Sequence, residues 1–72
     1  MKNKLREYRL QKGWTQAELA RRVSVSARTI ISLETGRYNP SLLLAYRLSR
    51  ELEAGMEELY CLEENLREEE TE

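Results

Sequence analysis

The chain has 72 residues, which is enough for one small domain with a compact core and leaves little room for an enclosed active site. It contains no histidine, no aspartate and a single cysteine, so it lacks both the converging ligands of a metal site and the histidine base on which nucleophilic catalysis usually depends. Composition therefore predicts a protein that is not an enzyme and needs no metal or cofactor. The formal net charge of -1, taken alone, argues against a nucleic-acid partner.

The first residues lead directly into an amphipathic pattern, without an apolar run long enough for a signal peptide or a membrane span. We therefore expect a cytoplasmic protein with no membrane partner. Apolar residues recur at helical spacing and strict alternation is absent, which predicts an all-α fold. The first helix is expected from Asn3 to Lys12, with Leu5 and Tyr8 on its inner stripe and Gly13 as its end.

A second helix is predicted to begin after Thr15, which is a good N-cap residue. Glu18 stands three residues further on, so the two side chains form the pattern of a capping box, in which each satisfies the other's backbone amide. Its inner face is expected to consist of Leu19, Ala20 and Val23.

The connection to the third helix is only Ser24 and Val25, so two helices joined this tightly must cross at a steep angle. Ser26 is a good N-cap for a helix that runs through Glu34, and Gly36 ends it.

The segment Arg37 to Pro40 predicts a turn, and Ser41 is the expected N-cap of a fourth helix that runs to about Leu52. Gly55 then interrupts the helical pattern. The expected apolar stripe of this fourth helix is Leu43, Leu44, Leu48 and Leu52.

A fifth helix is predicted from about Met56, and like-charge repulsion among the last glutamates is expected to fray its end. Cys61, the lone cysteine, is expected to be a small apolar packing residue that forms no internal disulfide.

Charge is strongly segregated along the chain. Residues 1–50 hold eleven basic and three acidic side chains, a net charge of +8, whereas residues 51–72 hold one arginine and ten glutamates, a net charge of -9. This favours a basic working domain, residues 1–62, followed by an acidic extension, residues 63–72. Two ordinary solvated faces would explain the charge counts equally well.

The segment from Thr15 to Pro40 reads TQAELARRVSVSARTIISLETGRYNP. Its pattern of TQAELA, then V-x-V-S, then T-I-x-x-x-E-x-G-R-Y-N-P resembles the DNA-binding domain of the lambdoid phage repressors and Cro proteins, the Xre (Cro/CI-type) helix-turn-helix regulators. The resemblance covers roughly Leu5 to Leu62. It implies a compact five-helix lambda-repressor-like domain with a central helix-turn-helix, and a transcriptional repressor that binds double-stranded DNA in a sequence-specific manner.

The helical phase of the third helix supports this interpretation. Ile30 and Leu33 lie together and should face the core with Val23 and Val25. The other side, where a major groove could receive it, is expected to hold Ala27, Arg28, Ile31 and Ser32. Ile31 is apolar on a face predicted to be exposed, so either it contacts DNA through its methyl groups or the helix is tilted from the phase assumed.

The resemblance places the base-reading positions on Ala27, Arg28, Thr29 and Ser32. The planar fork of Arg28 can donate two hydrogen bonds to a guanine, worth about 1–3 kcal/mol of discrimination, and the methyl group of Ala27 suits the methyl group of thymine. The alternatives for Arg28 are a phosphate contact or no contact at all.

Contacts to the DNA backbone are implied for two segments. Thr15 and Gln16, at the start of the second helix, correspond to positions that contact the phosphates, and the turn formed by Arg37, Tyr38 and Asn39 corresponds to the place where the family holds the next phosphate. Both segments have a structural alternative, because Gln16 also suits a helix start and the turn also fixes the entry into the fourth helix.

Two further positions follow from the resemblance. Arg9 and Glu34 match a partly buried ion pair that ties the first helix to the end of the recognition helix. Ser24 stands where family members often have glycine, so we expect it in a left-handed or otherwise unfavourable backbone conformation.

A homodimer is expected, because a two-fold pair places two recognition helices on successive major grooves of a pseudo-palindromic site. The candidate interface is the apolar stripe Met56, Leu59, Leu62 and Leu66, although Met56 and Leu59 could equally close the core of the monomer. Two alternatives stay open: an antitoxin whose protein partner covers the acidic C-terminus, and a protein-interaction module that keeps the fold without binding DNA.

Overall fold

The order of the helices confirms the predicted all-α fold, with one difference at the C-terminal end. The computed structural model describes residues 1–71, and this part of the chain forms six helices and no strand. The predicted fifth helix is divided into two. The six helices are α1 (Leu5–Gln11), α2 (Gln16–Arg22), α3 (Ala27–Glu34), α4 (Leu42–Leu52), α5 (Met56–Tyr60) and α6 (Leu62–Glu70).

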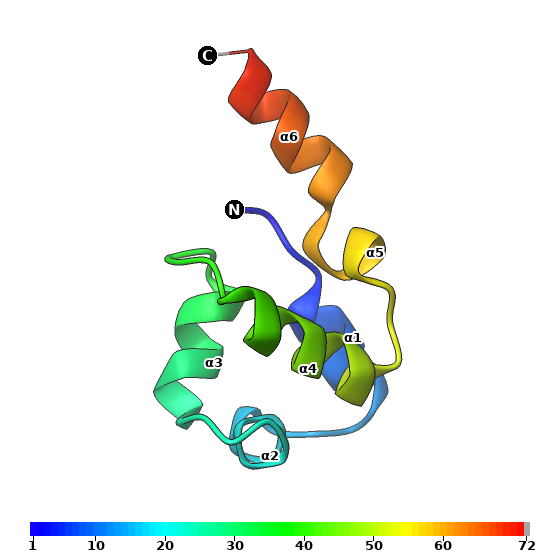
Figure 1. Cartoon of the computed structure of the whole chain (residues 1–72). Coiled ribbons are helices and arrows are strands. Elements are labelled where there is room, and N and C mark those ends of the chain that lie inside the picture. Colours follow the sequence, from blue (N-terminus) through cyan, green and yellow to red (C-terminus); the bar gives the residue numbers. More distant parts are fainter. Residues whose placement is uncertain (72) are drawn as a thin grey trace.

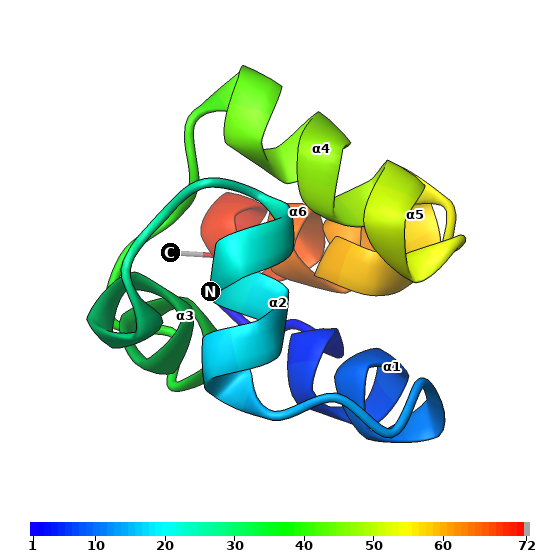
Figure 2. The same cartoon turned by 90° about the horizontal axis from the view of Figure 1, so that it is seen from below.

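Helices α1 to α5 surround a single core, and α6 projects away from it (Figure 1). Seen from below, α4 lies along one edge of the molecule and α1 along the opposite edge, with α2 between them (Figure 2). The projecting helix makes the molecule longer than it is wide, with extents of 37 × 21 × 20 Å. The largest fully buried side chains are Tyr60, Leu5, Leu19, Ile30, Leu33, Leu48, Leu52, Leu59 and Val23.

Three helices begin at the predicted N-cap residues. The hydroxyl oxygens of Thr15, Ser26 and Ser41 each accept a hydrogen bond from the backbone amide three residues ahead, at 3.0, 3.2 and 3.2 Å. The prediction that the Glu18 side chain would in turn accept from the Thr15 backbone amide is wrong. The Glu18 carboxylate accepts from Arg21 instead. The hydrogen bond from Arg21 is the main cause that lowers the pKa of the Glu18 carboxyl.

Helices α1 to α4 all end in the same hydrogen-bonded turn, in which a residue with positive φ lets two amides bond back to the last turn. Gly13 and Gly36 fill this position after α1 and α3, both with φ of 74°. Ser24 fills it after α2 with φ of 60°, as predicted, and Glu53 fills it after α4 with φ of 54°. Two of these four helices therefore end on a residue with a Cβ atom in a conformation that favours glycine.

The predicted stripe of α4 is wrong at one position. Leu44, Leu48 and Leu52 are buried as expected, but 70% of the Leu43 surface is exposed. Because each residue of a helix turns about 100° from the last, Leu43 cannot share a face with the other three. Ala45 and Ser49 complete the buried side instead.

Helix α5 ends because Cys61 adopts the left-handed helical conformation. This residue is buried, as predicted for a packing residue, and its φ of 49° stops the helix. The break turns Tyr60 into the core, where its hydroxyl donates to the Ala45 carbonyl at 2.9 Å, and burial raises the pKa of that hydroxyl. The side-chain nitrogen of Asn65 donates to the Tyr60 carbonyl at 2.7 Å and lies 3.1 Å from the Cys61 carbonyl, so the kink is stabilised from α6.

The first four residues connect α6 to the end of α3. The Lys2 amide donates to the Asn65 side-chain oxygen at 3.0 Å, and the Asn65 side chain donates back to the Lys2 carbonyl at 2.8 Å. Asn3 donates its side-chain amide to the Leu33 carbonyl at 2.8 Å and accepts from the Leu5 amide, so α1 begins later than predicted. The N-terminus therefore lies between α6 and the turn that follows α3 (Figure 1).

The strain at Ser24 leads to the first prediction. Replacement Ser24→Gly should stabilise the domain by about 1 kcal/mol, because glycine adopts positive φ without the clash of a Cβ atom. Urea unfolding followed by circular dichroism measures the change. The matched control is Gly13→Ala, where nothing lies within 4 Å of the added Cβ and φ alone should cost stability. A Ser24→Gly protein no more stable than the original would contradict the assignment of strain.

Candidate nucleic-acid interface

Helices α2 and α3 form the predicted helix-turn-helix. The connection between α2 and α3 is closed by hydrogen bonds from the Ser24 and Val25 amides to carbonyls of α2, at 3.3 and 3.0 Å. Leu19 and Ala20 of α2 face Ile30 and Leu33 of α3 within the core. The turn and this shared core hold α3 at the edge of the molecule, where one of its sides is free (Figure 2).

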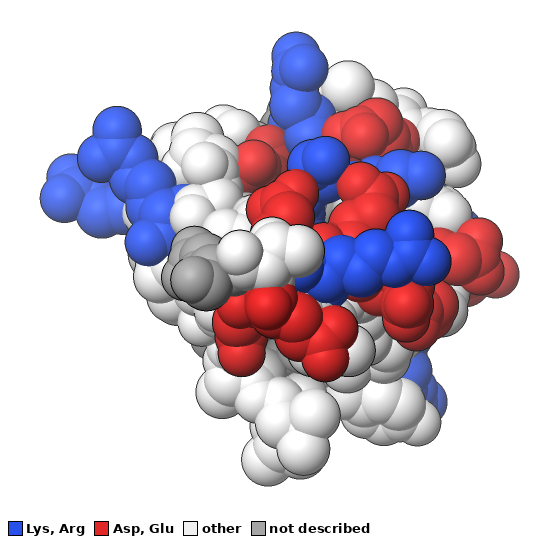
Figure 3. All heavy atoms as spheres, turned by 90° about the horizontal axis from the view of Figure 1, so that it is seen from above, with Lys and Arg blue, Asp and Glu red and all other residues white. Residues whose placement is uncertain are grey.

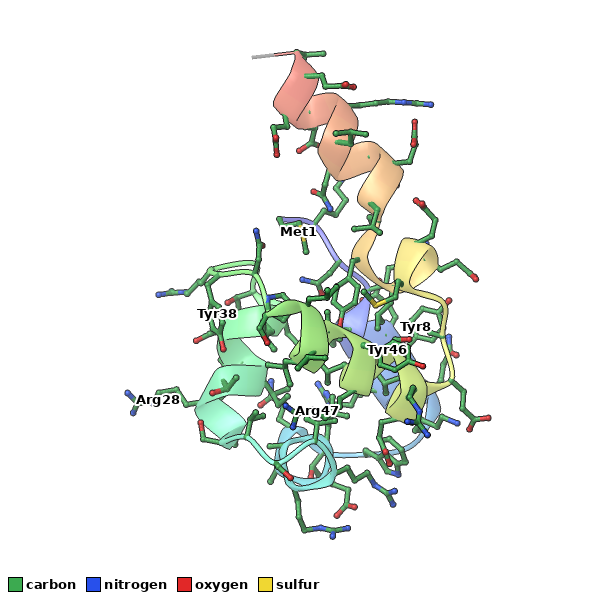
Figure 4. All side chains as sticks on the ribbon, viewed as in Figure 1. Met1, Tyr8, Arg28, Tyr38, Tyr46 and Arg47 are labelled. Carbon is green, nitrogen blue, oxygen red and sulfur yellow. The ribbon has the colours of Figure 1, made fainter. Side chains whose placement is uncertain are left out.

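The phase of α3 is the one predicted from the sequence. Ile30 and Leu33 are 1% exposed, whereas Arg28 is exposed and Ile31 is 44% exposed. The Arg28 side chain points away from the body of the protein (Figure 4). The exposed Ile31 therefore belongs to the outward face, and the helix is not tilted. Sequence reasoning left Ile31 out of the base-reading residues, although its place between Arg28 and Thr35 on the helix puts it near the centre of that face.

The other predicted base-reading residues lie at the borders of the outward face. Ala27 is half-buried and packs partly against the core. Thr29 and Ser32 are also half-buried, and the Thr29 hydroxyl lies 3.0 Å from the Ser26 hydroxyl. Arg28 is therefore the only long, charged side chain that α3 presents on this face.

The predicted phosphate-binding residues fall into two groups on either side of α3. Gln16 is half-buried, and its amide nitrogen donates to Glu34 at 3.1 Å. Because that nitrogen carries two hydrogens, one is left for an anion. Arg37, Tyr38 and Asn39 are exposed in the turn after α3, and Tyr38 projects on the same side as Arg28 (Figure 4).

A buried ion pair joins the ends of this region. The Arg9 guanidinium donates from Nε to one Glu34 oxygen at 2.6 Å and from Nη2 to the other at 3.1 Å, and its Nη1 donates to the Trp14 carbonyl at 2.9 Å. The two side chains are 8% and 4% exposed. The sequence did not predict the hydrogen bond from Gln16 to the same carboxylate, because it offered Gln16 only as a DNA contact or as the start of a helix.

Charge on the surface is only partly segregated. Viewed from above, acidic side chains gather around the end of α6 with basic side chains among them, and further basic side chains project from the molecule on the side of α3 (Figure 3). Within residues 1–71, neither Arg28 nor Arg37 takes part in an ion pair. These two positive charges are therefore available to an external anion.

The predicted interface stripe is divided between the core and the surface. Leu59 is fully buried and Met56 is half-buried against the core. Leu59 therefore belongs to the core of the monomer, and its prediction as an interface residue is wrong. Leu62 and Leu66 are 40% and 50% exposed on α6, which has no buried residue. Only these two members of the stripe can serve fully as a contact surface.

The part of the chain that the structure describes contains neither a membrane-spanning helix nor a metal-binding cluster. Among residues 1–71, no helix combines the length and the apolar character that crossing a membrane requires. The same residues hold no group of three or more metal-ligating side chains.

The fold and the free face of α3 define a helix-turn-helix DNA-binding domain. Residues 5–59 match the model of a helix-turn-helix family, and the chain belongs to that family. It is 45% identical over 64 residues to an uncharacterized helix-turn-helix transcriptional regulator of Archaeoglobus fulgidus, covering 89% of this chain and 91% of the relative. A relative with the same description from Methanothermobacter thermautotrophicus is 48% identical over 66 residues, covering 90% and 96%. The antitoxin HipB of Escherichia coli K12 is 33% identical over 54 residues, covering 75% of this chain and 61% of HipB.

The ion pair leads to the second prediction. Replacement Arg9→Ala leaves a carboxylate that is 4% exposed without its cation, and should cost about 3–5 kcal/mol of the free energy of unfolding. A loss of this size should lower the Tm by more than about 10 °C in a domain of this length.

The control for this measurement is Arg21→Ala. Arg21 pairs with Glu18 on the surface, with 70% of its side chain exposed, so its removal should change the Tm very little. An unchanged Tm for Arg9→Ala in the same thermal scan would refute the structural role of the pair.

Proposed function

We propose that this DNA-binding regulator is a sequence-specific transcriptional repressor that places α3 in the major groove of double-stranded DNA. Residues 1–62 are the DNA-binding domain in this proposal, and residues 63–72 are an acidic extension. The observation that carries the proposal is the free outward face of α3, where Arg28 is exposed and has no ion-pair partner within residues 1–71.

The proposed base contacts lie near the start of α3, which is the part of a recognition helix that reaches the base edges first. Arg28 would read a guanine through two hydrogen bonds. Ile31, exposed next to it, would add an apolar contact to a thymine methyl group. Ala27, Thr29 and Ser32 border these contacts and would shape the fit to neighbouring bases.

The proposed backbone contacts lie on both sides of α3. Thr15 and the free hydrogen of the Gln16 amide would meet one phosphate, and Arg37 with the backbone amides near Tyr38 and Asn39 would meet the next. Because Gln16 is already held by Glu34, its amide is oriented before DNA arrives. An oriented donor loses less conformational entropy on binding.

A homodimer is the proposed active form. A single α3 offers few base contacts, and a two-fold pair doubles them on a pseudo-palindromic site. The exposed Leu62 and Leu66 on an otherwise polar helix support a contact through α6. The ten glutamates from residue 51 onward would be repelled by phosphate, so the acidic segment should face away from the duplex.

A second candidate function is that of an antitoxin, favoured by the similarity to HipB. The antitoxin would bind DNA through the same helix while a protein partner covers the acidic C-terminus. Co-purification of the tagged chain from its own host distinguishes the two, since a repressor alone needs no stoichiometric partner.

The third prediction concerns sequence specificity. Selection from a random duplex library at near-physiological salt should enrich a two-fold symmetric site with half-sites about 10 base pairs apart. Arg28→Ala should lose or relax the preference at one position of each half-site, while Arg6→Ala, which removes one exposed charge from α1, should keep the same site. The specific-repressor proposal fails if no sequence is enriched and binding only weakens smoothly as salt is added.

The fourth prediction concerns the phosphate contact at the turn after α3. Arg37→Ala should weaken binding to selected and unrelated duplexes by a similar factor, and should reduce the slope of log affinity against log salt by about 1. Fluorescence anisotropy over a salt series measures both. A loss confined to the selected sequence would instead assign Arg37 to base reading, and Arg6→Ala is again the charge-matched control.

A further inference from the structure

Helix α4 carries an apolar surface that neither the core nor the proposed DNA contacts use. Leu42, Leu43 and Tyr46 are 76%, 70% and 52% exposed, and these three form what we name the apolar half of the α4 face. Helical geometry continues their two rows into Arg50 and Arg47, one turn further along. These two exposed arginines form the basic half of the same face, and Tyr46 and Arg47 mark the two halves in Figure 4.

Contacts within the protein hold the two arginines of the basic half in place, but no carboxylate in residues 1–71 pairs with them. Arg47 donates to the Val23 carbonyl at 3.1 Å, and the Arg50 guanidinium lies 6.0 Å from the centre of the Tyr46 ring. Within residues 1–71, neither arginine forms an ion pair. Both line a cavity of about 200 Å³ that they share with Arg22 and Glu51.

Helix α6 has the opposite character. The monomer contacts it through Asn65 and through the ion pairs of Lys2 with Glu64 and Glu68, and leaves its two leucines exposed. The helix is nine residues long, none of its residues is buried, and a helix this short has little stability alone in water. Leu62 and Leu66, one turn apart, form its apolar stripe. Glu69 and Glu70 flank the same side at the end of the helix, and we name them the acidic tip.

We propose that α6 of one copy lies on the α4 face of a second copy, so that a two-fold dimer is held by two reciprocal α4–α6 contacts. The proposal rests on the homodimer of the proposed function and identifies the surface that receives α6. It sets the apolar stripe against the apolar half and the acidic tip against the basic half. Because both contacts are related by one two-fold axis, the assembly closes at two copies.

The spacing of the two surfaces agrees with parallel helices. The apolar stripe and the acidic tip of α6 are centred about 8 Å apart along the helix, and the apolar and basic halves of α4 are centred about 7 Å apart. Both pairs of surfaces can therefore meet at once, without a shift in register.

The simplest alternative, a symmetric pair of α6 helices, is opposed by charge. Each α6 holds five glutamates and one arginine, so pairing two of them would bring like charges together around a small apolar contact. The α4 face offers a larger apolar area and two free cations.

Charge reversal with rescue tests the proposal, with the dimer dissociation constant of the full chain measured by sedimentation equilibrium. Arg47→Glu with Arg50→Glu should weaken the dimer by about tenfold or more, as removal of close interfacial charge pairs does, and so should Glu69→Arg with Glu70→Arg. The four changes together should restore most of the affinity. Leu10→Ser, which alters an exposed leucine of α1, is the control that should change nothing.

Each other outcome overturns the proposal. If reversal on α4 leaves the dimer unchanged and reversal on α6 tightens it, then α6 pairs with α6. A chain that stays monomeric overturns both this contact and the homodimer. Leu43→Ser should also weaken the dimer. It should leave unchanged the Tm of the monomer, measured well below the dimer dissociation constant, which separates loss of contact from loss of folding.

The DNA selection separates this inference from the proposed function. If the selection enriches no sequence, the repressor proposal fails whatever the dimer contact is. If it enriches a site while charge reversal on α4 leaves the dimer unchanged, only the α4–α6 contact fails.

Discussion

The buried pair of Arg9 and Glu34 is the interaction on which the position of the recognition helix depends. One guanidinium binds both oxygens of the carboxylate and the Trp14 carbonyl, and Gln16 donates to the same carboxylate. A charge in this position is costly without its partner, so each group can be buried only while the other is in place. The network thereby ties the end of α3 to α1 and to the start of α2. An otherwise small core of aliphatic side chains gains a directional contact that fixes how α3 lies on the scaffold.

The same end of α3 is held from a second side by the N-terminal residues. Asn3 binds the Leu33 carbonyl, and a Cβ atom on Gly36 would lie 2.9 Å from the Met1 carbonyl oxygen. Glycine at this position therefore serves both the positive φ of the turn and the close approach of another part of the chain. Because Asn65 binds Lys2 on the other side, the orientation of α6 is coupled to the end of the recognition helix. The two features that the proposed dimer needs, a fixed α3 and a fixed α6, share these few hydrogen bonds.

Local chemistry explains why most helix boundaries could be predicted. Thr15, Ser26 and Ser41 cap the helices that they were expected to cap, since a hydroxyl one residue before a helix satisfies an amide that has no other partner. The errors came where a pattern allowed two answers. Leu43 stands among four leucines and an alanine, so composition did not reveal which of them face the core. Likewise Leu59, Leu62 and Leu66 suit a single continuous helix, and only the reversal at Cys61 divides them between the core and the surface.

The sequence by itself determined the all-α class, the helix-turn-helix, the outward face of α3 and the strained turn at Ser24. The helices and the outward face follow from spacing and capping within a few residues of chain, whereas the strain at Ser24 was expected because the family that the chain resembles often has glycine there. Only the tertiary structure decided that Gln16 supports Glu34, that the N-terminus joins α6 to α3, and that α4 presents an apolar and basic face to solvent. Each of these depends on which surfaces are left uncovered once five helices close around one core. These contacts are set by the packing of segments that lie far apart in the sequence, and the spacing of neighbouring residues does not determine them.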